Sequence, residues 1–262
     1  MDIPDEFDKL VETVATLRAP KGCPWDRQQT HQTLKQFAIE ETYELVEAIE
    51  SGDSDRVRDE LGDLLLQVLL HAQIAREANQ FDIADVCSTL REKLHRRHPH
   101  VFADTQVSGV EDVLHNWEHI KRAEPGYDQR KSVLDGVPES LPALMRAAKI
   151  SRKAARTGFD WPNVRSILDK LKEETAELEE ALDRGDKGAV EEEIGDLLFT
   201  VVNIARFKDI DPEEALRRML HKFVYRFSRI EERAAEFGMK IEDMTLPEMD
   251  RVWDETKHGN DN

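Results

Sequence analysis

The chain has 262 residues, and its 37 Lys and Arg against 55 Asp and Glu give a formal net charge of −18. A protein this acidic repels a polyphosphate backbone, which excludes the class of proteins that coat nucleic-acid polymers and implies that a phosphate ligand arrives with a divalent cation. With 39% hydrophobic and 35% charged residues, the chain is too apolar and too patterned to be wholly disordered, and its length fits one large or two ordinary domains.

No segment of the sequence predicts export or a membrane span. The opening MDIPDEFDKL lacks the basic and apolar regions of a secretory signal, and the most apolar stretch, residues 64–70, is far shorter than the roughly 20 residues that cross a bilayer. The two cysteines, Cys23 and Cys87, form neither a disulfide framework nor a CxxC motif. We therefore expect a cytoplasmic protein without a membrane partner.

The first half of the chain predicts a helix hairpin that follows a helical stretch over residues 5–18. Apolar residues from Leu34 to Ile49 recur at helical spacing, which predicts the first arm of the hairpin. The sequence SGDS at residues 51–54 then supplies stop, turn and cap signals before a second helix from about residue 55 to 78.

The segment that follows the first half, residues 124–140, carries Pro and Gly without apolar periodicity and is predicted to be a linker. A further helical stretch over residues 142–157 opens the second half. No run of alternating β-branched residues stands out, and 12 Gly are few for a barrel or a doubly wound sheet. We expect an all-α fold made of helical bundles.

The two halves are copies of one unit. Residues 40–65 and 173–198 share 15 identities in 26 ungapped positions at a constant offset of 133. Similar short motifs flank both segments in the same order: Gly22-Cys23-Pro24-Trp25 and Gly158-Phe159-Asp160-Trp161 before them, and Lys93/Arg97, Trp117/Lys121, Lys222/Arg226 and Trp253/Lys257 after them. A duplication of this extent predicts tandem domains, at residues 1–123 and 141–262.

Each copy places pairs of carboxylates, three residues apart, on both arms of its hairpin. They are Glu41 and Glu44 with Glu60 and Asp63 in the first copy, and Glu174 and Glu177 with Glu193 and Asp196 in the second. A hairpin brings such pairs together, where they repel one another unless they are protonated or bind cations. Ligands made only of oxygen favour a hard ion such as Mg²⁺, which also binds substrate phosphates.

A single EExxE motif is ordinarily an exposed helix face, so the metal site depends on the combination. Both copies repeat the two pairs at a fixed hairpin spacing, and each carries a glycine, Gly62 or Gly195, inside its second helix. Glycine is unfavourable within helices, which suggests close packing or a ligand nearby. In the second copy, Lys170 precedes Glu174 by one turn and places a cation where a phosphate could be held.

The basic and aromatic pairs downstream allow two interpretations. Lys and Arg bind phosphate oxygens, and an indole ring stacks on a base, but the tryptophans also suit a core and the cations an acidic surface. The histidines of KLHRRHPHVF, at residues 93–102, are interpreted as surface or packing residues because Pro99 breaks the helix that would align them.

Several segments carry a resemblance to a known family. They are the two EExxE motifs with the ExxD that follows each, GCPWD at 22–26, RRHPHVFAD at 96–104 and SLPALMRAAKI at 140–150. Over nearly its whole length the chain resembles the tandem MazG-type nucleoside triphosphate pyrophosphohydrolases of the all-α NTP pyrophosphohydrolase superfamily. The resemblance implies a homodimer that hydrolyses nucleoside triphosphates to monophosphate and pyrophosphate with broad tolerance of base, in nucleotide-pool housekeeping or stress regulation. Mg²⁺ is the implied cofactor, with Mn²⁺ as a substitute.

The resemblance also implies roles for individual residues. The metal ligands fall on Glu174, Glu177, Glu193 and Asp196, and the nucleotide contacts on Lys170, Lys222, Arg226 and Trp253, with Lys257 as a further candidate. A spare carboxylate, Glu173 or Glu192, is expected to orient the water or accept its proton. The C-terminal copy is expected to be the main catalytic half. At the offset of 133, Phe37 stands where Lys170 would fall, so we expect the first copy to bind phosphate less well.

Two other hypotheses stay open at this point. A carboxylate-bridged di-iron centre would use the ExxH pairs Glu92/His95 and Glu255/His258, which do not fall at equivalent places in the repeat. A helical dimer that binds nucleotide as a regulator, without turnover, would also keep the acidic residues. A P-loop ATPase is disfavoured because the sequence has no GxxxxGK[ST] motif.

Overall fold

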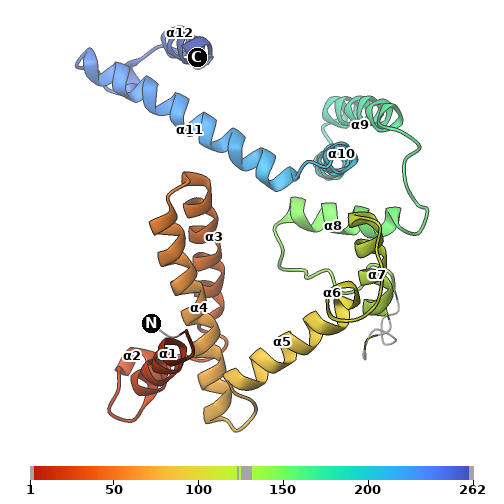
Figure 1. The fold of residues 1–262 in the computed structure, drawn as a ribbon. Helices are drawn as coiled ribbons and strands as arrows, with labels where there is room; N and C mark the ends of the chain where they lie inside the picture. Colours follow the sequence, from red (N-terminus) through yellow and green to blue (C-terminus); the bar gives the residue numbers. More distant parts are fainter. Residues whose placement is uncertain (1–2, 123, 125–131, 260–262) are drawn as a thin grey trace. The chain divides into compact units, whose positions relative to one another are not determined.

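The computed structural model describes residues 3–122, 124 and 132–259. The chain divides into two compact units, Met1–Tyr127 and Asp128–Asn262 (Figure 1). Within the described residues all regular structure is helical and no strand occurs, which confirms the expected all-α class. Part of the expected linker 124–140, residues 125–131, lies outside the described residues, and the domain limits 1–123 and 141–262 stay a prediction.

The N-terminal unit is built around the helix hairpin α3–α4. Its helices are α1 Ile3–Arg18, α2 Pro24–Gln28, α3 Lys35–Ser51, α4 Ser54–Glu77, α5 Ile83–Arg97, α6 Pro99–Phe102 and α7 Val110–Arg122. Helix α1 packs on α4, and the core between them is formed by Val14, Leu34, Leu69 and Leu70. Helix α5 ends just before Pro99, as the sequence predicted.

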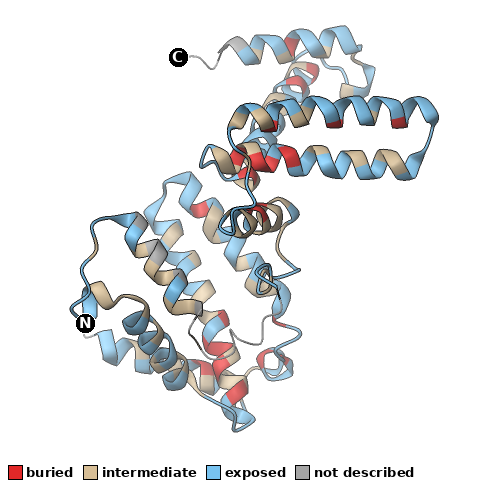
Figure 2. Cartoon of the chain, turned by 90° about the vertical axis from the view of Figure 1, so that its right-hand side faces the viewer, coloured by how far each residue is buried: buried red, intermediate tan, exposed pale blue. Residues whose placement is uncertain are grey.

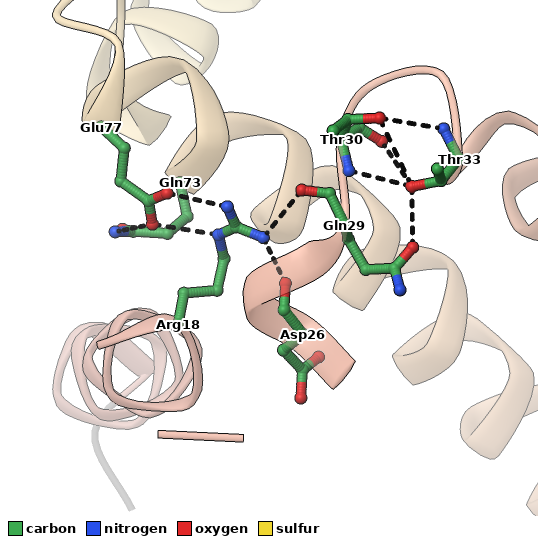
Figure 3. Close-up of polar contacts among 7 residues, drawn as sticks. All are labelled: Arg18, Asp26, Gln29, Thr30, Thr33, Gln73 and Glu77. Carbon is green, nitrogen blue, oxygen red and sulfur yellow. Dashed lines mark hydrogen bonds and ion pairs between the residues drawn. The ribbon is translucent and has the colours of Figure 1, made fainter. Parts of the chain in front are cut away.

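One buried arginine ties three segments of this unit together (Figure 3). The Arg18 side chain is only 5% exposed and donates to both carboxylate oxygens of Glu77 on α4, at 3.0 and 2.7 Å. It also donates to the backbone carbonyls of Asp26 and Gln29, which follow α1 in the chain. These hydrogen bonds hold the pKa of the Glu77 carboxyl below its usual range. Arg18 therefore fixes α1 and the GCPWD segment against α4.

The C-terminal unit repeats the hairpin as α9–α10. Its helices are α8 Ala143–Ala155, α9 Val164–Arg184, α10 Lys187–Phe207, α11 Pro212–Glu236, the short 3₁₀ helix η1 Ile241–Asp243 and α12 Leu246–Gly259. Helix α8 packs against α10, and α12 packs against α11. The long α11 leads from α10 to α12 (Figure 1). Figure 2 shows buried residues in short stretches, with intermediate and exposed residues over the rest of the helices.

The two hairpins close with the same turn. Gly52 and Gly185 end the first arms with φ of 71° and 67°, a left-handed conformation that costs glycine nothing. The next residues, Asp53 and Asp186, accept hydrogen bonds from two backbone N–H groups at the start of the second arms. The turn predicted from SGDS is thus confirmed, and its equivalent fixes how the arms pair in the second copy.

None of the described helices combines the length and the apolar character that a bilayer crossing requires. Both cysteines are free thiols.

Candidate metal and nucleotide site

In the C-terminal unit, carboxylates from both arms of the hairpin converge. Glu174 and Glu177 lie one turn apart on α9, and Glu193 faces them from α10; one oxygen from each lies within 4.8 Å of the others. We call these three residues the C-terminal acidic cluster. Glu174 is only 5% exposed, which is rare for a glutamate. A buried carboxylate with two others beside it requires compensating positive charge.

The N-terminal unit has an equivalent group, the N-terminal acidic cluster, formed by Glu41 and Glu44 on α3 and Glu60 on α4. One oxygen from each again lies within 4.8 Å of the others. Glu41 and Glu60 are half-buried, whereas Glu44 is exposed. The duplication therefore preserves the carboxylate arrangement in both copies.

In each cluster, two of the three carboxyl groups have a raised pKa. Burial is the largest cause of the raised pKa of Glu41 and Glu44, and the neighbouring carboxylates raise it further. Burial also raises the pKa of Glu177 and Glu193, with a further increase from the adjoining Glu174. A divalent cation bound at these oxygens would restore full ionisation.

The fourth predicted ligand of each copy stays outside the tight group. Asp63 and Asp196 follow Glu60 and Glu193 by three residues on the same helices, but neither belongs to the sets whose oxygens approach within 4.8 Å. Their charges still reach the clusters: Asp63 raises the pKa of Glu41, and Asp196 raises that of Glu193. Both side chains are exposed, so each could serve as an outer ligand of a metal ion or as one that keeps contact with solvent.

Lys170 lies at the C-terminal acidic cluster itself. Its Nζ is 2.7 Å from Glu173 Oε1, 2.8 Å from Glu174 Oε1 and 4.0 Å from Glu177 Oε2. Hydrogen bonds to Glu173 and Glu174 raise the pKa of Lys170 above its usual range, so its ammonium stays charged. The phosphate contact expected of Lys170 stays a prediction; in the structure its ammonium neutralises carboxylates. The two proposed bases, Glu173 and Glu192, are exposed beside the cluster.

No equivalent cation serves the N-terminal acidic cluster at this position. Phe37 packs against the core of its unit and meets Trp25 edge-on, with ring centroids 5.7 Å apart. Three carboxylates therefore converge there without the lysine that accompanies the second copy. The copies share ligand geometry and differ in local charge.

The other predicted nucleotide contacts lie on α11 and α12. The guanidinium carbon of Arg226 is 5.4 Å from the centroid of the Trp253 ring, and Phe223 meets the same indole edge-on. Lys222 and Lys257 are exposed on these helices. Across the part of the chain that the structure describes, no hydrogen bond or ion pair joins these residues to the acidic cluster. The acidic cluster and the arginine–tryptophan group are thus two separate parts of the predicted site.

The first copy repeats the arginine–tryptophan pair, with Arg97 at 5.5 Å from the ring centroid of Trp117. In this copy the arginine also binds an acidic side chain: the Glu124 carboxylate accepts hydrogen bonds from Arg97 Nε at 2.8 Å and from Arg96. These arginines lower the pKa of Glu124 to about 2. In the second copy, no described carboxylate lies within ion-pair distance of Arg226.

The expectation of close packing at Gly62 and Gly195 is wrong within each unit. A Cβ built at either glycine would have no neighbour within 4 Å among the described residues. Steric crowding inside the unit therefore does not explain why a poor helix former stands at these equivalent places. The second explanation, a ligand or partner at these positions, stays a prediction.

The histidines do not form a metal site in the described part of the chain. His95 stacks on Phe102 with ring centroids 4.0 Å apart, and His98 meets Trp117 edge-on. The described groups with metal-ligand geometry consist of glutamates alone. The ExxH pair Glu92/His95 lies on the exposed side of α5, which disfavours a closed di-iron centre there. The side chain of His258 lies outside the described residues.

The structure also contains a cavity that no sequence motif predicts. It measures about 280 Å³, lies between α8, α10 and the segment before α9, and includes Phe159, Trp161, Phe199 and Arg206 in its lining. In the sequence, the GFDW motif at 158–161 indicates only the repeat. Buried Ser151 and Asn203 come from different helices, so no local pattern could have predicted their contact.

Comparisons with known proteins point to one family. A family model, the MazG nucleotide pyrophosphohydrolase domain, matches residues 29–102 and 163–230, which contain the two acidic clusters. The nucleoside triphosphate pyrophosphohydrolase/pyrophosphatase MazG of Thermotoga maritima is 45% identical over 97% of this chain and 97% of its own length. A nucleoside triphosphate pyrophosphohydrolase of Escherichia coli is 43% identical, with 97% of each chain covered. The uncharacterized protein YabN of Bacillus subtilis is 51% identical over 96% of this chain and 52% of its own length.

Proposed function

Since the chain belongs to the MazG nucleotide pyrophosphohydrolase family, we propose that it hydrolyses nucleoside triphosphates to nucleoside monophosphate and pyrophosphate at its C-terminal acidic cluster. The observation that carries this proposal is the convergence of Glu174, Glu177 and Glu193 within 4.8 Å, with Glu174 buried. Such a cluster is costly to the fold unless it binds cations, and a triphosphate is a ligand that brings them.

The donor set fits Mg²⁺, and Mn²⁺ as a substitute. Glu174, Glu177 and Glu193 offer only carboxylate oxygens, which suit a hard ion, and exposed Asp196 one turn from Glu193 supplies a further oxygen. When bound, the ion supplies positive charge for the triphosphate and acidity for an attacking water. Lys170 would exchange its carboxylate partners for a phosphate oxygen once the cluster holds divalent charge.

The remaining roles follow from the charges of the side chains. A water oxygen bonds to the α-phosphorus, the bond from that phosphorus to the β-bridging oxygen breaks, and pyrophosphate leaves. Glu173 or Glu192, which border the cluster and are exposed, would accept the proton of the water. Lys222 and Arg226 would hold the phosphates, with Lys257 as an additional cation near Trp253.

A second copy of the chain is the proposed partner. Helix α11 exposes Leu220, Phe223, Val224 and Phe227, which recur at helical spacing along one face, and Leu216 extends this stripe. Exposed apolar stripes of this kind ordinarily mark a protein interface. A homodimer would cover the stripe and would allow Lys222 and Arg226 to meet a cluster from either chain. Light scattering should give a dimer mass for the parent and a lower mass for Val224→Glu.

The product of the reaction tests the proposed bond cleavage. The full chain is incubated with a nucleoside triphosphate and Mg²⁺, and the products are separated and identified. We expect equal amounts of nucleoside monophosphate and pyrophosphate, with loss of both in excess EDTA. Orthophosphate with diphosphate, or nucleotide binding without any product, would contradict the proposal. The second result would favour the regulatory dimer. A role in clearing nucleotides from the cytoplasmic pool is the biological setting that we propose.

A further inference from the structure

One carboxylate in the N-terminal unit is held by two successive arginines at the end of α5. Glu124 Oε1 accepts a hydrogen bond from Arg97 Nε at 2.8 Å, and Glu124 Oε2 accepts one from Arg97 Nη2 at 2.5 Å. Arg96 donates to Glu124 Oε1 from Nε at 3.2 Å and from Nη2 at 2.9 Å. Arginine binds phosphate through the same paired donors, because both anions present two oxygens to the planar guanidinium.

This contact is largely withdrawn from water. The side chains of Arg97 and Glu124 are each 16% exposed. Hydrogen bonds from the arginines hold the pKa of Glu124 at about 2, so its carboxylate is fully charged at neutral pH. Charge-assisted bonds of this kind are stronger than those between neutral groups. Another anion must therefore displace Glu124 before it can bind the same donors.

The two copies of the duplicated unit differ at this carboxylate. The guanidinium carbon lies 5.5 Å from the indole centroid for Arg97 and Trp117, and 5.4 Å for Arg226 and Trp253. Among the described residues, no carboxylate forms an ion pair with Arg226. The sequence shows the same difference, since a glutamate follows Trp117 by seven residues and an uncharged asparagine follows Trp253 by seven.

The surroundings of this glutamate favour an anion in its place. Lys93 lies one turn before Arg97 on α5, and Lys121 lies one turn after Trp117 on α7, which packs against α5. Both lysines are half-buried. A terminal phosphate group carries up to two negative charges near neutral pH, so it can match two guanidinium groups more fully than one carboxylate does.

We propose that Glu124 is an internal competitor that closes an anion site formed by Arg96 and Arg97, and that a phosphate group of a polyphosphate or nucleotide competes with it for these arginines. A competitor within the chain lowers the apparent affinity by the fraction of molecules in which it is displaced. The contact therefore sets the phosphate concentration at which the N-terminal unit binds a ligand. The proposal concerns this unit alone and is independent of bond cleavage at the C-terminal acidic cluster.

Removing the charge of Glu124 tests the proposal. In Glu124→Gln the side chain keeps its size while the arginines lose their ionised partner. The full-length parent and variant are titrated with inorganic pyrophosphate in EDTA, so that no divalent ion brings phosphate to the acidic clusters. The indole N–H signal of Trp117 in the NMR spectrum, identified by its loss in Trp117→Phe, reports binding beside Arg97. The variant should bind pyrophosphate about 10- to 100-fold more tightly than the parent.

Two controls accompany this variant. Glu214 also binds two successive arginines, Arg217 and Arg218, in the other unit. Glu214→Gln removes the same charge from the chain and should leave the Trp117 titration as it is in the parent. Arg97→Gln combined with Glu124→Gln should abolish the gain in affinity, because the paired donors are lost.

Three results would overturn the proposal. Equal pyrophosphate affinity in the parent and in Glu124→Gln would show that Glu124 only joins α5 to the segment after α7. A gain that survives in the double variant with Arg97→Gln would place the anion elsewhere. Adenosine has no phosphate and should leave the Trp117 signal unchanged; a response as large as that to pyrophosphate would show that the ring binds a base instead.

A second variant covers the case in which Glu124→Gln disturbs the packing of α7. Glu124→Asp keeps the charge but shortens the side chain by one methylene group, which weakens its bonds to both arginines. It should bind pyrophosphate more tightly than the parent and less tightly than Glu124→Gln does in its folded fraction. Affinity in Glu124→Asp equal to that of the parent would contradict the proposal.

Discussion

Lys170 Nζ lies 2.8 Å from Glu174 Oε1, one helical turn apart on α9. The lysine therefore supplies part of the positive charge that the buried glutamate requires. The first copy has the same carboxylates and a phenylalanine in place of this lysine. The two copies of the duplicated unit therefore differ in this ion pair, whereas their acidic residues are the same.

Replacing this lysine should make the C-terminal unit dependent on Mg²⁺. In Lys170→Met, the free energy of unfolding without divalent ions should fall by about 1 to 3 kcal/mol, because buried Glu174 loses a charged partner. Addition of Mg²⁺ should recover most of this loss. The measurement is urea unfolding with EDTA and with Mg²⁺. The control is Lys172→Met, whose exposed pair with Asp169 contributes little. If Mg²⁺ raises the free energy of unfolding by the same amount in the parent and in Lys170→Met, the role given to the lysine is contradicted.

The raised carboxyl pKa values predict an unusual pH dependence. Glu41, Glu44, Glu177 and Glu193 bind protons more tightly in the folded chain than their ordinary value of 4.5 implies. The folded state then holds more protons than the unfolded state, so stability without Mg²⁺ should fall as pH rises from 4.5 through the raised values. Mg²⁺ competes with those protons, so its stabilisation should be larger at pH 7 than at pH 5. Thermal melts at both pH values, with and without Mg²⁺, measure this, and a Mg²⁺ effect that is larger at pH 5 would refute it.

The glycines inside the second arms allow a test of what approaches them. A Cβ at Gly195 meets nothing within 4 Å in the unit. Because alanine favours the helix more than glycine does, Gly195→Ala should raise the free energy of unfolding by roughly 1 kcal/mol. Gly185→Ala is the contrasting control, because φ of +67° at Gly185 disfavours any side chain and stability should fall. If Gly195→Ala destabilises the protein instead, a ligand or partner occupies the space beside this glycine in solution, and the prediction is contradicted.

Much of this fold follows from local sequence signals. The hairpin turns at Gly52 and Gly185, their Asp caps and the paired glutamates all depend on residues close in sequence, and the structure places them as those signals indicate. The ion pair between Arg206 and Asp160 joins residues 46 positions apart, and no local pattern encodes such a contact. The pairing of Lys170 with carboxylates was missed for another reason: helical spacing gives the neighbours of a lysine without saying which of them it binds.

The Arg18 contacts predict that damage to the N-terminal unit leaves the C-terminal chemistry intact. Arg18→Met removes the partner of Glu77 and the donor to two backbone carbonyls, and should lower the stability of the N-terminal unit by about 2 to 4 kcal/mol. Hydrogen exchange in α1 and α4 measures the loss. The control is Arg58→Met, whose ion pairs are exposed and contribute little. Turnover per folded chain should stay within about twofold of the parent, and a parallel loss of turnover would show that the N-terminal unit takes part in catalysis.

The most direct test of the account measures pyrophosphate release from a nucleoside triphosphate with Mg²⁺ by three proteins. They are the parent chain, Glu174→Gln with Glu177→Gln, and Glu41→Gln with Glu44→Gln. Loss of two direct metal ligands should exceed the 10- to 100-fold effects typical of outer-shell residues, so the first double variant should lose more than about 100-fold in rate. The second should keep the rate of the parent. Retention of turnover by Glu174→Gln with Glu177→Gln would contradict the central claim that these carboxylates hold the catalytic metal.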